Sequence, residues 1–398
     1  MKPATGSGGE SLSVHQLLQR LASEYRSRFA DAMPRRHARI LARILSCRTS
    51  ALGGQMFACD DCGELHYRYH SCGDRHCPLC GQTDADEWLE DRKARLLLPT
   101  HYFLATFTVP EALRPFIRSH QEIGLNLLFA CSSQALQDLA ANPRHLGASL
   151  GMLGVCHTWS RTLIYHPHIH YLIPGGGLTP DGRQWIGADP KFLLPVKALG
   201  AHFRTLYKNR LQEEHPDLFA QVPAKAWKRS WIVDCRPAGS GENALRYLSR
   251  YIFKTATGNR DVTLLPDGRM RWDYRESSTG KPASLKLDPL DWMGRFMQHI
   301  LPRGFTRVRT FGWLHPAAKV RANRVRALLG EAPLLSPAEE AAWLPSGDPE
   351  IDPDFEPSDD PLPAPASHAP LCPRCGKVMR LVASWKPGHV WMLAPRPP

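Results

Sequence analysis

The sequence predicts an α+β fold, in which helices pack on an antiparallel sheet that follows a cysteine-rich segment. Short runs of β-branched and aromatic residues alternate with longer stretches whose apolar residues recur every three or four positions. Six of the 11 cysteines lie between residues 47 and 80. The 398 residues, 43% of them hydrophobic, suffice for two or more domains with real cores, which excludes a disordered chain.

The strands and helices of the central region can be placed in order along the chain. Residues 102–109 are rich in β-forming residues and stop at Pro110, which cannot donate to a sheet. The pattern then predicts a helix, a two-stranded hairpin, a helix, a strand and a helix, over residues 115–140, 152–159 with 168–173, 195–213, 230–235 and 242–256. This order favours an antiparallel sheet with helices on one face.

Composition divides the chain into four segments. Residues 331–370 hold ten acidic residues, ten prolines and no Lys or Arg, and such a segment predicts a flexible linker. We therefore expect a helical and zinc-binding domain, a main α+β domain, this linker and a short tail, over residues 1–98, 99–330, 331–370 and 371–398.

The charge of the chain indicates an anionic partner. The formal net charge is +12, and outside the acidic segment 50 Lys and Arg residues face only 28 Asp and Glu residues. Basic residues, mostly Arg, gather in four clusters, and the planar guanidinium group of Arg pairs with phosphate through two donors. The clusters lie within residues 26–43, 225–229, 303–309 and 319–326. Nucleic acid is the partner class that this excess favours.

The apolar pattern indicates whether the chain enters a membrane or is secreted. No run approaches the ~18 apolar residues of a membrane span, and the first residues lack the apolar core of a secretion signal. Cysteines in a chain without such a signal point to metal ligands rather than disulfides. We expect an intracellular protein with no membrane partner, and the oligomeric state stays open.

Two Cys-x-x-Cys pairs predict a structural zinc site. The pairs Cys59–Cys62 and Cys77–Cys80 are separated by fourteen residues, and four thiolates at such spacing form a tetrahedral zinc site. Two interpretations remain for Cys47, His66, Cys72 and His76. They could bind a second zinc, or they could be packing or surface residues. A third pair, Cys372–Cys375, follows the acidic segment and predicts half of a zinc ribbon, because no further Cys pair comes after it.

Three histidines predict a divalent-cation site. His168 and His170 alternate along one strand, so both imidazoles lie on the same face of the sheet. If the hairpin turns within residues 161–165, His157 on the preceding strand lies opposite the pair. Three imidazoles leave coordination positions open for phosphate oxygens and water, which is the arrangement of a Lewis-acid site.

Two tyrosines lie on one stripe of a predicted helix. Tyr247 and Tyr251 are four residues apart and project one turn above the other. The flanking cations, which we expect to contact DNA, favour the phenolate and would neutralise charge on a phosphate under attack; they are Arg246, Arg250 and Lys254. Cation, imidazoles and phenols together suit transesterification of a phosphodiester.

Taken jointly, these motifs resemble the rolling-circle insertion-sequence transposases of the two-tyrosine HUH class. The matching stretches are Cys59-Asp-Asp-Cys-Gly, Ser71-Cys-Gly-Asp-Arg-His-Cys-Pro-Leu-Cys80, His157-Thr-Trp, His166-Pro-His-Ile-His170 with Pro174-Gly-Gly-Gly177, and Tyr247-Leu-Ser-Arg-Tyr251. They span about residues 35–330, which is most of the chain outside the acidic segment and the tail.

The resemblance implies a fold, an activity and its cofactors. The nuclease domain would be a ferredoxin-like sheet, with Mg²⁺ or Mn²⁺ on His168, His170 and His157. Tyr247 and Tyr251 would attack single-stranded DNA and form 5′-phosphotyrosine links. The zinc domain and the arginines would recognise single-stranded or hairpin transposon ends, and target DNA would be a further partner. Such a protein would be cytoplasmic and nucleoid-associated in a bacterium.

Three alternatives remain at this stage. A conjugative relaxase or plasmid replication initiator would use the same chemistry, although the chain lacks the phosphate-binding glycine loop of a fused helicase. A zinc-stabilised nucleic-acid-binding protein without activity would use its aromatic residues for packing or stacking. A zinc hydrolase built on the His168–His170 pair would form no covalent adduct with DNA.

Overall fold

The chain divides into two units. The computed structural model describes residues 9–80, 89, 93, 96–252, 257, 259, 261–276, 279–336, 339, 369–387 and 389–392. The first unit takes in Met1–Gln82, Phe253–Ile300 and Pro357–Pro398, and the second takes in Thr83–Ile252 and Leu301–Glu356. Both units mix helices with antiparallel sheets, so the predicted α+β class is confirmed.

This partition differs from the four consecutive segments expected from composition. Residues 253–300 and the tail belong to the same unit as the N-terminal segment, because strands pair across long stretches of the chain. Glu10 pairs with Leu264, and Ala58 pairs with Arg380. Composition marks local boundaries but carries no signal for pairing between distant strands. Most of the acidic segment lies outside the described residues.

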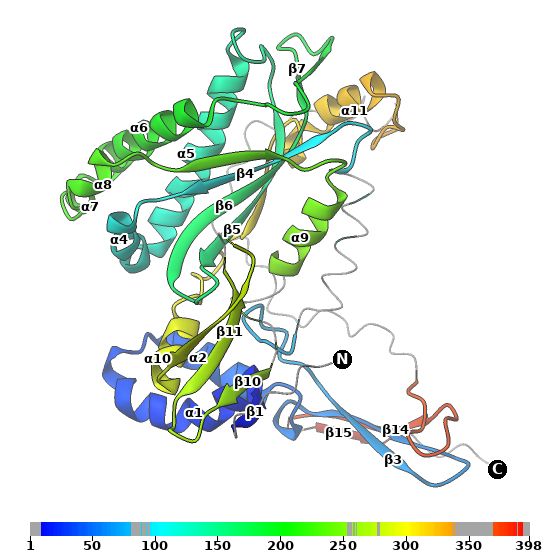
Figure 1. The fold of residues 1–398 in the computed structure, drawn as a ribbon. Coiled ribbons are helices and arrows are strands. Elements are labelled where there is room, and N and C mark those ends of the chain that lie inside the picture. The colour runs from blue at the N-terminus through cyan, green and yellow to red at the C-terminus, as the bar shows by residue number, and fades with distance from the viewer. Residues whose placement is uncertain are drawn as a thin grey trace. The chain divides into compact units, whose positions relative to one another are not determined.

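The second unit is built on a five-stranded antiparallel sheet (Figure 1). Its spatial order is β13-β5-β6-β4-β9. Along the chain the elements come in the order β4, α5, β5, β6, α6 and β9. In the sheet β4 lies between β9 and β6, and β6 lies between β4 and β5. That is the split βαβ arrangement of a ferredoxin-like fold, with β13 added at one edge. The strands are β4 (Tyr102–Thr108), β5 (Gly151–Trp159), β6 (Tyr165–Pro174), β9 (Val233–Pro237) and β13 (Val308–Gly312).

Helices cover both faces of this sheet. On one face α5 (Gln121–Ala141) and α6 (Val196–Glu214) enclose the main core, where the Phe107 ring meets Tyr171 and Phe203 edge to face. On the other face α9 (Glu242–Ile252) buries Leu245 and Leu248 against apolar residues of β5 and β6 (Figure 1). The expectation of helices on one face is therefore wrong. The second face of the sheet also carries apolar residues, and the apolar side of α9 packs on them.

The remaining elements of the second unit are short. The predicted helix over 115–140 is two helices, since the chain turns between Ser119 and Gln121. A small two-stranded sheet, β7 with β8, begins within the Gly175-Gly-Gly177 segment. The bounds are η3 (Glu111–Leu113), α4 (Arg114–Ser119), β7 (Gly176–Leu178), β8 (Trp185–Gly187), α7 (Pro216–Phe219), α8 (Lys225–Lys228), η4 (Pro316–Ala318) and α11 (Lys319–Leu328).

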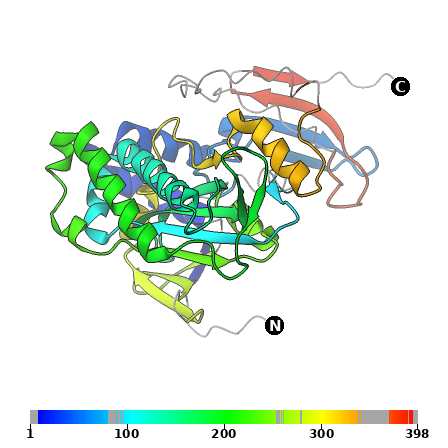
Figure 2. The ribbon, with the colours of Figure 1, turned by 90° about the horizontal axis from the view of Figure 1, so that it is seen from above.

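The first unit contains two four-stranded sheets (Figure 2). One has the order β1-β10-β11-β12, and the other has the order β15-β14-β2-β3. The first helix begins at a capping box, in which Ser13 and Gln16 exchange side-chain hydrogen bonds with each other's backbone amides. Of the described helices, none is long and apolar enough to span a membrane.

The bounds of these elements complete the fold. The helices are α1 (Val14–Phe29), η1 (Ala30–Ala32), α2 (Arg35–Ser46), η2 (Ser50–Leu52) and α10 (Pro289–Met297). The strands are β1 (Glu10–Ser13), β2 (Gly54–Ala58), β3 (Leu65–Tyr69), β10 (Asp261–Leu264), β11 (Met270–Arg275), β12 (Pro282–Leu287), β14 (Arg380–Lys386) and β15 (His389–Met392).

A glycine substitution tests how β13 closes the sheet beside β5. Gly312 has a φ of +62°, and a Cβ there would overlap the carbonyl oxygen of Leu150. We expect Gly312→Ala to lower the free energy of unfolding by more than about 2 kcal/mol, since strain and overlap add. Urea unfolding measures it. Gly304→Ala is the matched control: its φ is +69° and nothing lies within 4 Å of the added Cβ, so about 1 kcal/mol is expected. Equal losses for the two variants would contradict this packing.

Candidate metal site beside Tyr247

Three imidazoles meet on the sheet face that α9 covers. His157 pairs directly with His168 across β5 and β6, and His170 follows two residues along β6. The ring centroids lie 5.2 Å apart for His157 and His168, 4.7 Å for His157 and His170, and 4.9 Å for His168 and His170. One nitrogen from each ring lies within 4.8 Å of the others. The three side chains can therefore hold one metal ion.

Local sequence explains why the rings converge. Strand alternation sends His157, Val155 and Leu153 to the α9 face, while Cys156 and Met152 enter the main core. The connection between β5 and β6 lies within residues 160–164, and Leu163 has a φ of +59° there. Next to this turn Trp159 pairs with Tyr165, a register that would set His157 opposite Pro167 if it continued. A register shift between His157 and Trp159 instead sets His157 opposite His168.

Burial keeps these imidazoles neutral, which is the form that binds metals. Desolvation lowers the pKa of His168 to about 4. Desolvation, reinforced by His168 and His166, lowers the pKa of His170 to about 3. Desolvation and the neighbouring His170 and His168 hold the pKa of His157 well below its usual range. The site thus presents lone pairs without positive charge of its own.

Hydrogen bonds orient two of the rings. Nδ1 of His168 lies 2.6 Å from the carbonyl oxygen of His166. A carbonyl only accepts, so Nδ1 carries the proton and Nε2 keeps a lone pair for a cation. The hydroxyl of Thr106 on β4 lies 2.8 Å from Nδ1 of His170. Such outer partners hold metal-binding imidazoles in one tautomer and one orientation.

Tyr247 lies beside this cluster. Helix α9 buries Leu245 and Leu248, which leaves Tyr247 on the neighbouring stripe with 38% of its surface exposed. Its ring centroid is 5.9 Å from that of His170, and the rings are perpendicular. A partly exposed tyrosine and three histidines that could hold a metal ion therefore share one face of the sheet.

The other predicted residues of α9 are less defined. Tyr251 belongs to the helix one turn after Tyr247, but its side chain and that of Arg250 lie outside the described residues, as does the whole of Lys254. Arg246 is half exposed and forms an ion pair of 2.9 Å with Glu242, which Lys93 also approaches at 3.6 Å. Arg246 is thus held along its own helix by an i,i+4 pair, a contact that contributes little stability.

Three further side chains surround the cluster. His166 lies 5.0 Å from His168 by ring centroids, and desolvation lowers its pKa to about 3. The positive charge of Arg114 on α4 depresses the pKa of both His166 and His168, while Arg307 acts on His157 and lies over the Trp159 ring. Arg307 belongs to a predicted arginine cluster. The sequence analysis did not identify Arg114, because only the folded structure brings α4 near the histidines.

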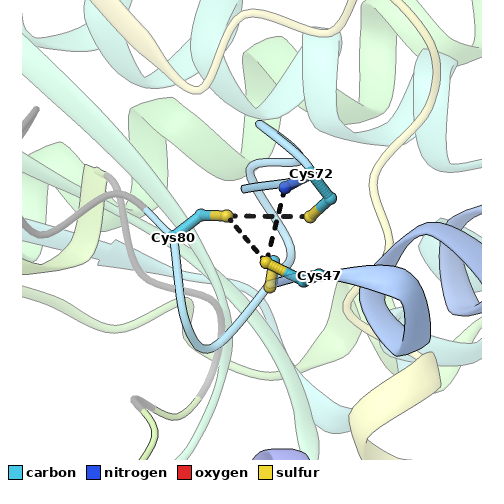
Figure 3. Close-up of side chains that lie close together, drawn as sticks. Cys47, Cys72 and Cys80 are labelled. Carbon is cyan, nitrogen blue, oxygen red and sulfur yellow. Dashed lines mark hydrogen bonds between the residues drawn. The ribbon is translucent and has the colours of Figure 1, made fainter. Parts of the chain in front are cut away.

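Eight cysteines of the first unit form two clusters, and neither is the predicted one. Cys59 and Cys62 lie with Cys372 and Cys375, whereas Cys77 and Cys80 lie with the remaining two cysteines, Cys47 and Cys72. Sulfur–sulfur distances in the second of these clusters are 3.5 Å from Cys80 to Cys47 and 3.6 Å from Cys80 to Cys72, and the amide of Cys72 donates to Cys47 Sγ (Figure 3). The predicted set Cys59, Cys62, Cys77 and Cys80 is wrong.

The β2–β3 hairpin explains the exchange of partners. Cys59 and Cys62 lie at its tip, and Cys47 and Cys72 flank its base, where His70 N–H donates to the Gly53 carbonyl. Strands of five residues separate tip from base by roughly 16 Å, far beyond the ~2.3 Å of a zinc–sulfur bond. One metal therefore cannot bridge both ends.

The histidines of the proposed second zinc are not ligands in either cluster. His66 lies within β3 opposite Phe57. His76 is buried, and its Nδ1 lies 2.9 Å from the Asp74 carboxylate. Cys47 and Cys72 from that set do belong to a cluster, but with Cys77 and Cys80. The tail is also not half a ribbon, because the N-terminal pair Cys59–Cys62 completes it.

Sheet, helices and metal-binding clusters define an α+β metalloprotein with an accessible tyrosine at its histidine site. A family model described as "Putative transposase" matches residues 151–322, and one described as "Transposase zinc-binding domain" matches residues 17–109. The first range contains His157, His168, His170 and Tyr247. The second contains the six N-terminal cysteines.

Two relatives carry transposase names. "Putative transposase y4qJ" of Sinorhizobium fredii (strain NBRC 101917 / NGR234) is 37% identical over 76% of this chain and 80% of its own length. "Transposase for insertion sequence element IS801" of Pseudomonas savastanoi pv. phaseolicola is 27% identical over 72% of this chain and 70% of its own length. No solved structure matches. The chain belongs to the insertion-sequence transposase family with an IS91-type zinc-binding domain, and its partner is DNA.

The low pKa values predict how the cluster responds to acid. In metal-free protein with ¹³C-labelled histidine, the NMR signal of His168 should stay that of a neutral ring from pH 8 to pH 5, since its pKa is about 4. His168→Gln assigns the signal. Because the folded pKa lies below the unfolded ~6.5, the stability from the neutral ring is present above pH 6.5 and is lost as pH falls. A signal that titrates near pH 6.5 and vanishes in the variant would contradict the burial of this ring.

Proposed function

We propose that the chain is a rolling-circle DNA transposase that cuts and rejoins single strands at transposon ends through 5′-phosphotyrosine intermediates. The observation that supports this most is the separation of 5.9 Å between the rings of Tyr247 and His170 on one sheet face. His157, His168 and His170 would hold Mg²⁺ or Mn²⁺, and the neutral imidazoles with two or more open positions suit such an ion. When bound, the cation supplies Lewis-acid polarisation of the scissile phosphate.

Tyr247 is the proposed nucleophile on the described part of α9. Its oxygen forms a bond to phosphorus while the bond from phosphorus to the 3′ oxygen breaks. The 3′ oxygen leaves with the electron pair and takes a proton, which yields a 3′-hydroxyl and a 5′-phosphotyrosine. The ester keeps the energy of the cleaved bond, so a 3′-hydroxyl can reverse the reaction without a nucleotide cofactor.

Tyr251 is proposed as the second nucleophile. A spacing of four residues on α9 places two side chains on one stripe, one turn apart. One phenol can then hold a strand covalently while the other attacks a second strand. Arg246, Arg250 and Lys254 are proposed to contact DNA near these tyrosines, and Arg114 and Arg307 add positive charge around the histidines.

The alternatives are less well supported. Both relatives are named as transposases, which favours that activity over a relaxase or a replication initiator. A non-catalytic binding protein would have no use for neutral, oriented imidazoles beside an exposed phenol. A zinc hydrolase built on His168 and His170 would leave Tyr247 without a role.

A covalent trap tests the proposed nucleophiles. Protein with Mn²⁺ and a 3′-labelled single-stranded oligonucleotide of the element's terminus should retain the label on a denaturing gel, whereas a 5′ label should be released. Tyr247→Phe/Tyr251→Phe should lose the adduct by at least a hundredfold, since a phenyl ring has no nucleophile. Dialysis against a buffer without Mn²⁺ should also abolish the adduct, and renewed addition of Mn²⁺ should restore it.

A matched control separates chemistry from folding. Tyr274→Phe makes the same change on β11, remote in sequence from α9, and should form the adduct at the wild-type rate. Adduct formation by the double variant, or retention of the 5′ label, would overturn the proposed reaction.

A further inference from the structure

Two Cys-x-x-Cys-Gly segments at opposite ends of the sequence fold into the same turn. The amide of Cys59 donates to the carbonyl of Glu64 at 2.9 Å, and the amide of Gly63 donates to the carbonyl of Cys59 at 2.9 Å. In the tail, the amide of Cys372 donates to the carbonyl of Lys377 at 2.7 Å, and the amide of Gly376 donates to the carbonyl of Cys372 at 2.9 Å. Both glycines have a positive φ, +74° and +75°. Each turn aims two sulfurs at one point, as zinc knuckles do.

The four sulfurs of these turns face one another. Cys59 Sγ lies 3.4 Å from Cys375 Sγ, and Cys62 Sγ lies 3.6 Å from Cys372 Sγ. All four sulfurs lie within 4.8 Å of one another. A tetrahedral zinc ion with bonds of ~2.3 Å separates its sulfurs by roughly 3.8 Å. The spacing therefore matches a closed four-thiolate site.

Strand pairing delivers the tail to this position. β14 pairs with β2 from Arg380 opposite Ala58 to Trp385 opposite Gly54. Phe57, Met379 and Leu381 pack beside the sulfurs, and the Arg380 guanidinium lies 3.0 Å from Asp60. The tail is thus part of the sheet beside the N-terminal knuckle, as Figure 2 shows for β14 with β2.

We propose that Cys59, Cys62, Cys372 and Cys375 form a second structural zinc site that joins the two ends of the chain. The matched zinc-binding domain stops at residue 109 and so does not include the tail pair. Four thiolates leave no open position, so the ion stabilises the fold and does not catalyse. Because ligands 310 residues apart meet at one ion, metal binding closes the first unit and orders the tail on it.

Zinc content tests the proposal. Exhaustively dialysed full-length protein should contain two zinc ions per chain by mass spectrometry of the metal, one for each cluster. Cys372→Ser/Cys375→Ser should contain one. Cys235→Ser, on β9 and outside both clusters, is the control and should contain two. One zinc in the wild type, or two in the double variant, would overturn the assignment.

A second measurement needs no variant. Cys375 is exposed, so a free thiol there should react with an alkylating agent within minutes, whereas a zinc-bound thiolate is protected. Peptide mass spectrometry should find Cys59, Cys62, Cys372 and Cys375 protected together and labelled together when a chelator removes the metal. Rapid labelling of Cys375 in the zinc-loaded protein would also overturn the site.

The opposite face of the same sheet carries three aromatic rings. Trp385 is paired with Gly54, which is paired with Tyr69, so the three residues form one row across β14, β2 and β3. The Trp385 ring lies 6.1 Å from Tyr69 and 6.4 Å from Tyr67. Gly54 has no side chain between them, and a Cβ there would lie 3.2 Å from the indole. Tyr67 and Tyr69 remain 49% and 37% exposed.

We infer that this aromatic face, Tyr67, Tyr69 and Trp385, stacks with the bases of single-stranded DNA. The inference rests on the proposed function, which requires an unpaired strand. Every base offers a π-face, so exposed rings beside positive charge are the usual platform for single strands. Residues 369–392 contain no acidic residue and supply Arg374, Lys377 and Lys386, besides Arg380, which is paired with Asp60. This positive charge favours a polyanion such as DNA as the partner.

Binding measurements test this face separately from catalysis. Tyr67→Ala/Tyr69→Ala should weaken binding of a single-stranded oligonucleotide by roughly tenfold or more per ring, measured by fluorescence anisotropy, and leave zinc content at the wild-type value. Phe192→Ala, which removes another exposed ring from the second unit, should bind like the wild type. Unchanged affinity in the double variant would overturn the aromatic face, whether or not the covalent adduct forms. If the wild type binds the oligonucleotide through these rings but forms no adduct, only the proposed reaction is contradicted.

Discussion

The antiparallel register of β5 with β6 is the constraint on which the candidate site depends. It sets His157 opposite His168 and, through the alternation of β6, adds His170 on the same face. A slip of β6 by one residue would send His168 and His170 into the core that α5 and α6 cover and would leave His157 on the α9 face. The same burial that makes the sheet stable keeps the imidazoles neutral. Fold stability and metal affinity therefore have one cause.

Helix α9 adds the second component of the site. Its apolar stripe, Leu245 and Leu248, packs beside Leu153, Val155 and Leu172. This packing determines the rotation of the helix, and the rotation brings Tyr247 to the histidines. The phenol is exposed because it lies at the border of the buried stripe, so an oligonucleotide can reach it. The packing of Leu245 and Leu248 thus positions the Tyr247 ring against His170.

The first unit depends on contacts between the ends of the chain. β1 pairs with β10, and β2 pairs with β14, so neither sheet exists within one continuous segment. Pairing of this kind carries a large loop-closure cost that local structure cannot offset. Two thiolate clusters with bound zinc would offset that cost at the ends of the β2–β3 hairpin.

The sequence predicted what depends on local periodicity. Strand alternation indicated that His168 and His170 share a face, and helical spacing separated Tyr247 from the buried leucines. The partner of each cysteine pair could not be predicted, because Cys-x-x-Cys fixes a turn but not the distant turn that completes it. The nearer pair, Cys77–Cys80, was chosen on separation in sequence, whereas β14 brings Cys372–Cys375 closer in space. Thr106 and Arg114 were missed for the same reason, since their roles arise only from neighbouring strands and helices.

The location of a bound cation tests the central claim most directly. Crystals of the protein soaked in Mn²⁺ and measured at the manganese absorption edge should show an anomalous peak bonded to ring nitrogens of His157, His168 and His170, with the Tyr247 ring on the same side. Well-ordered imidazoles without such a peak, or manganese bound elsewhere in the second unit, would contradict the account.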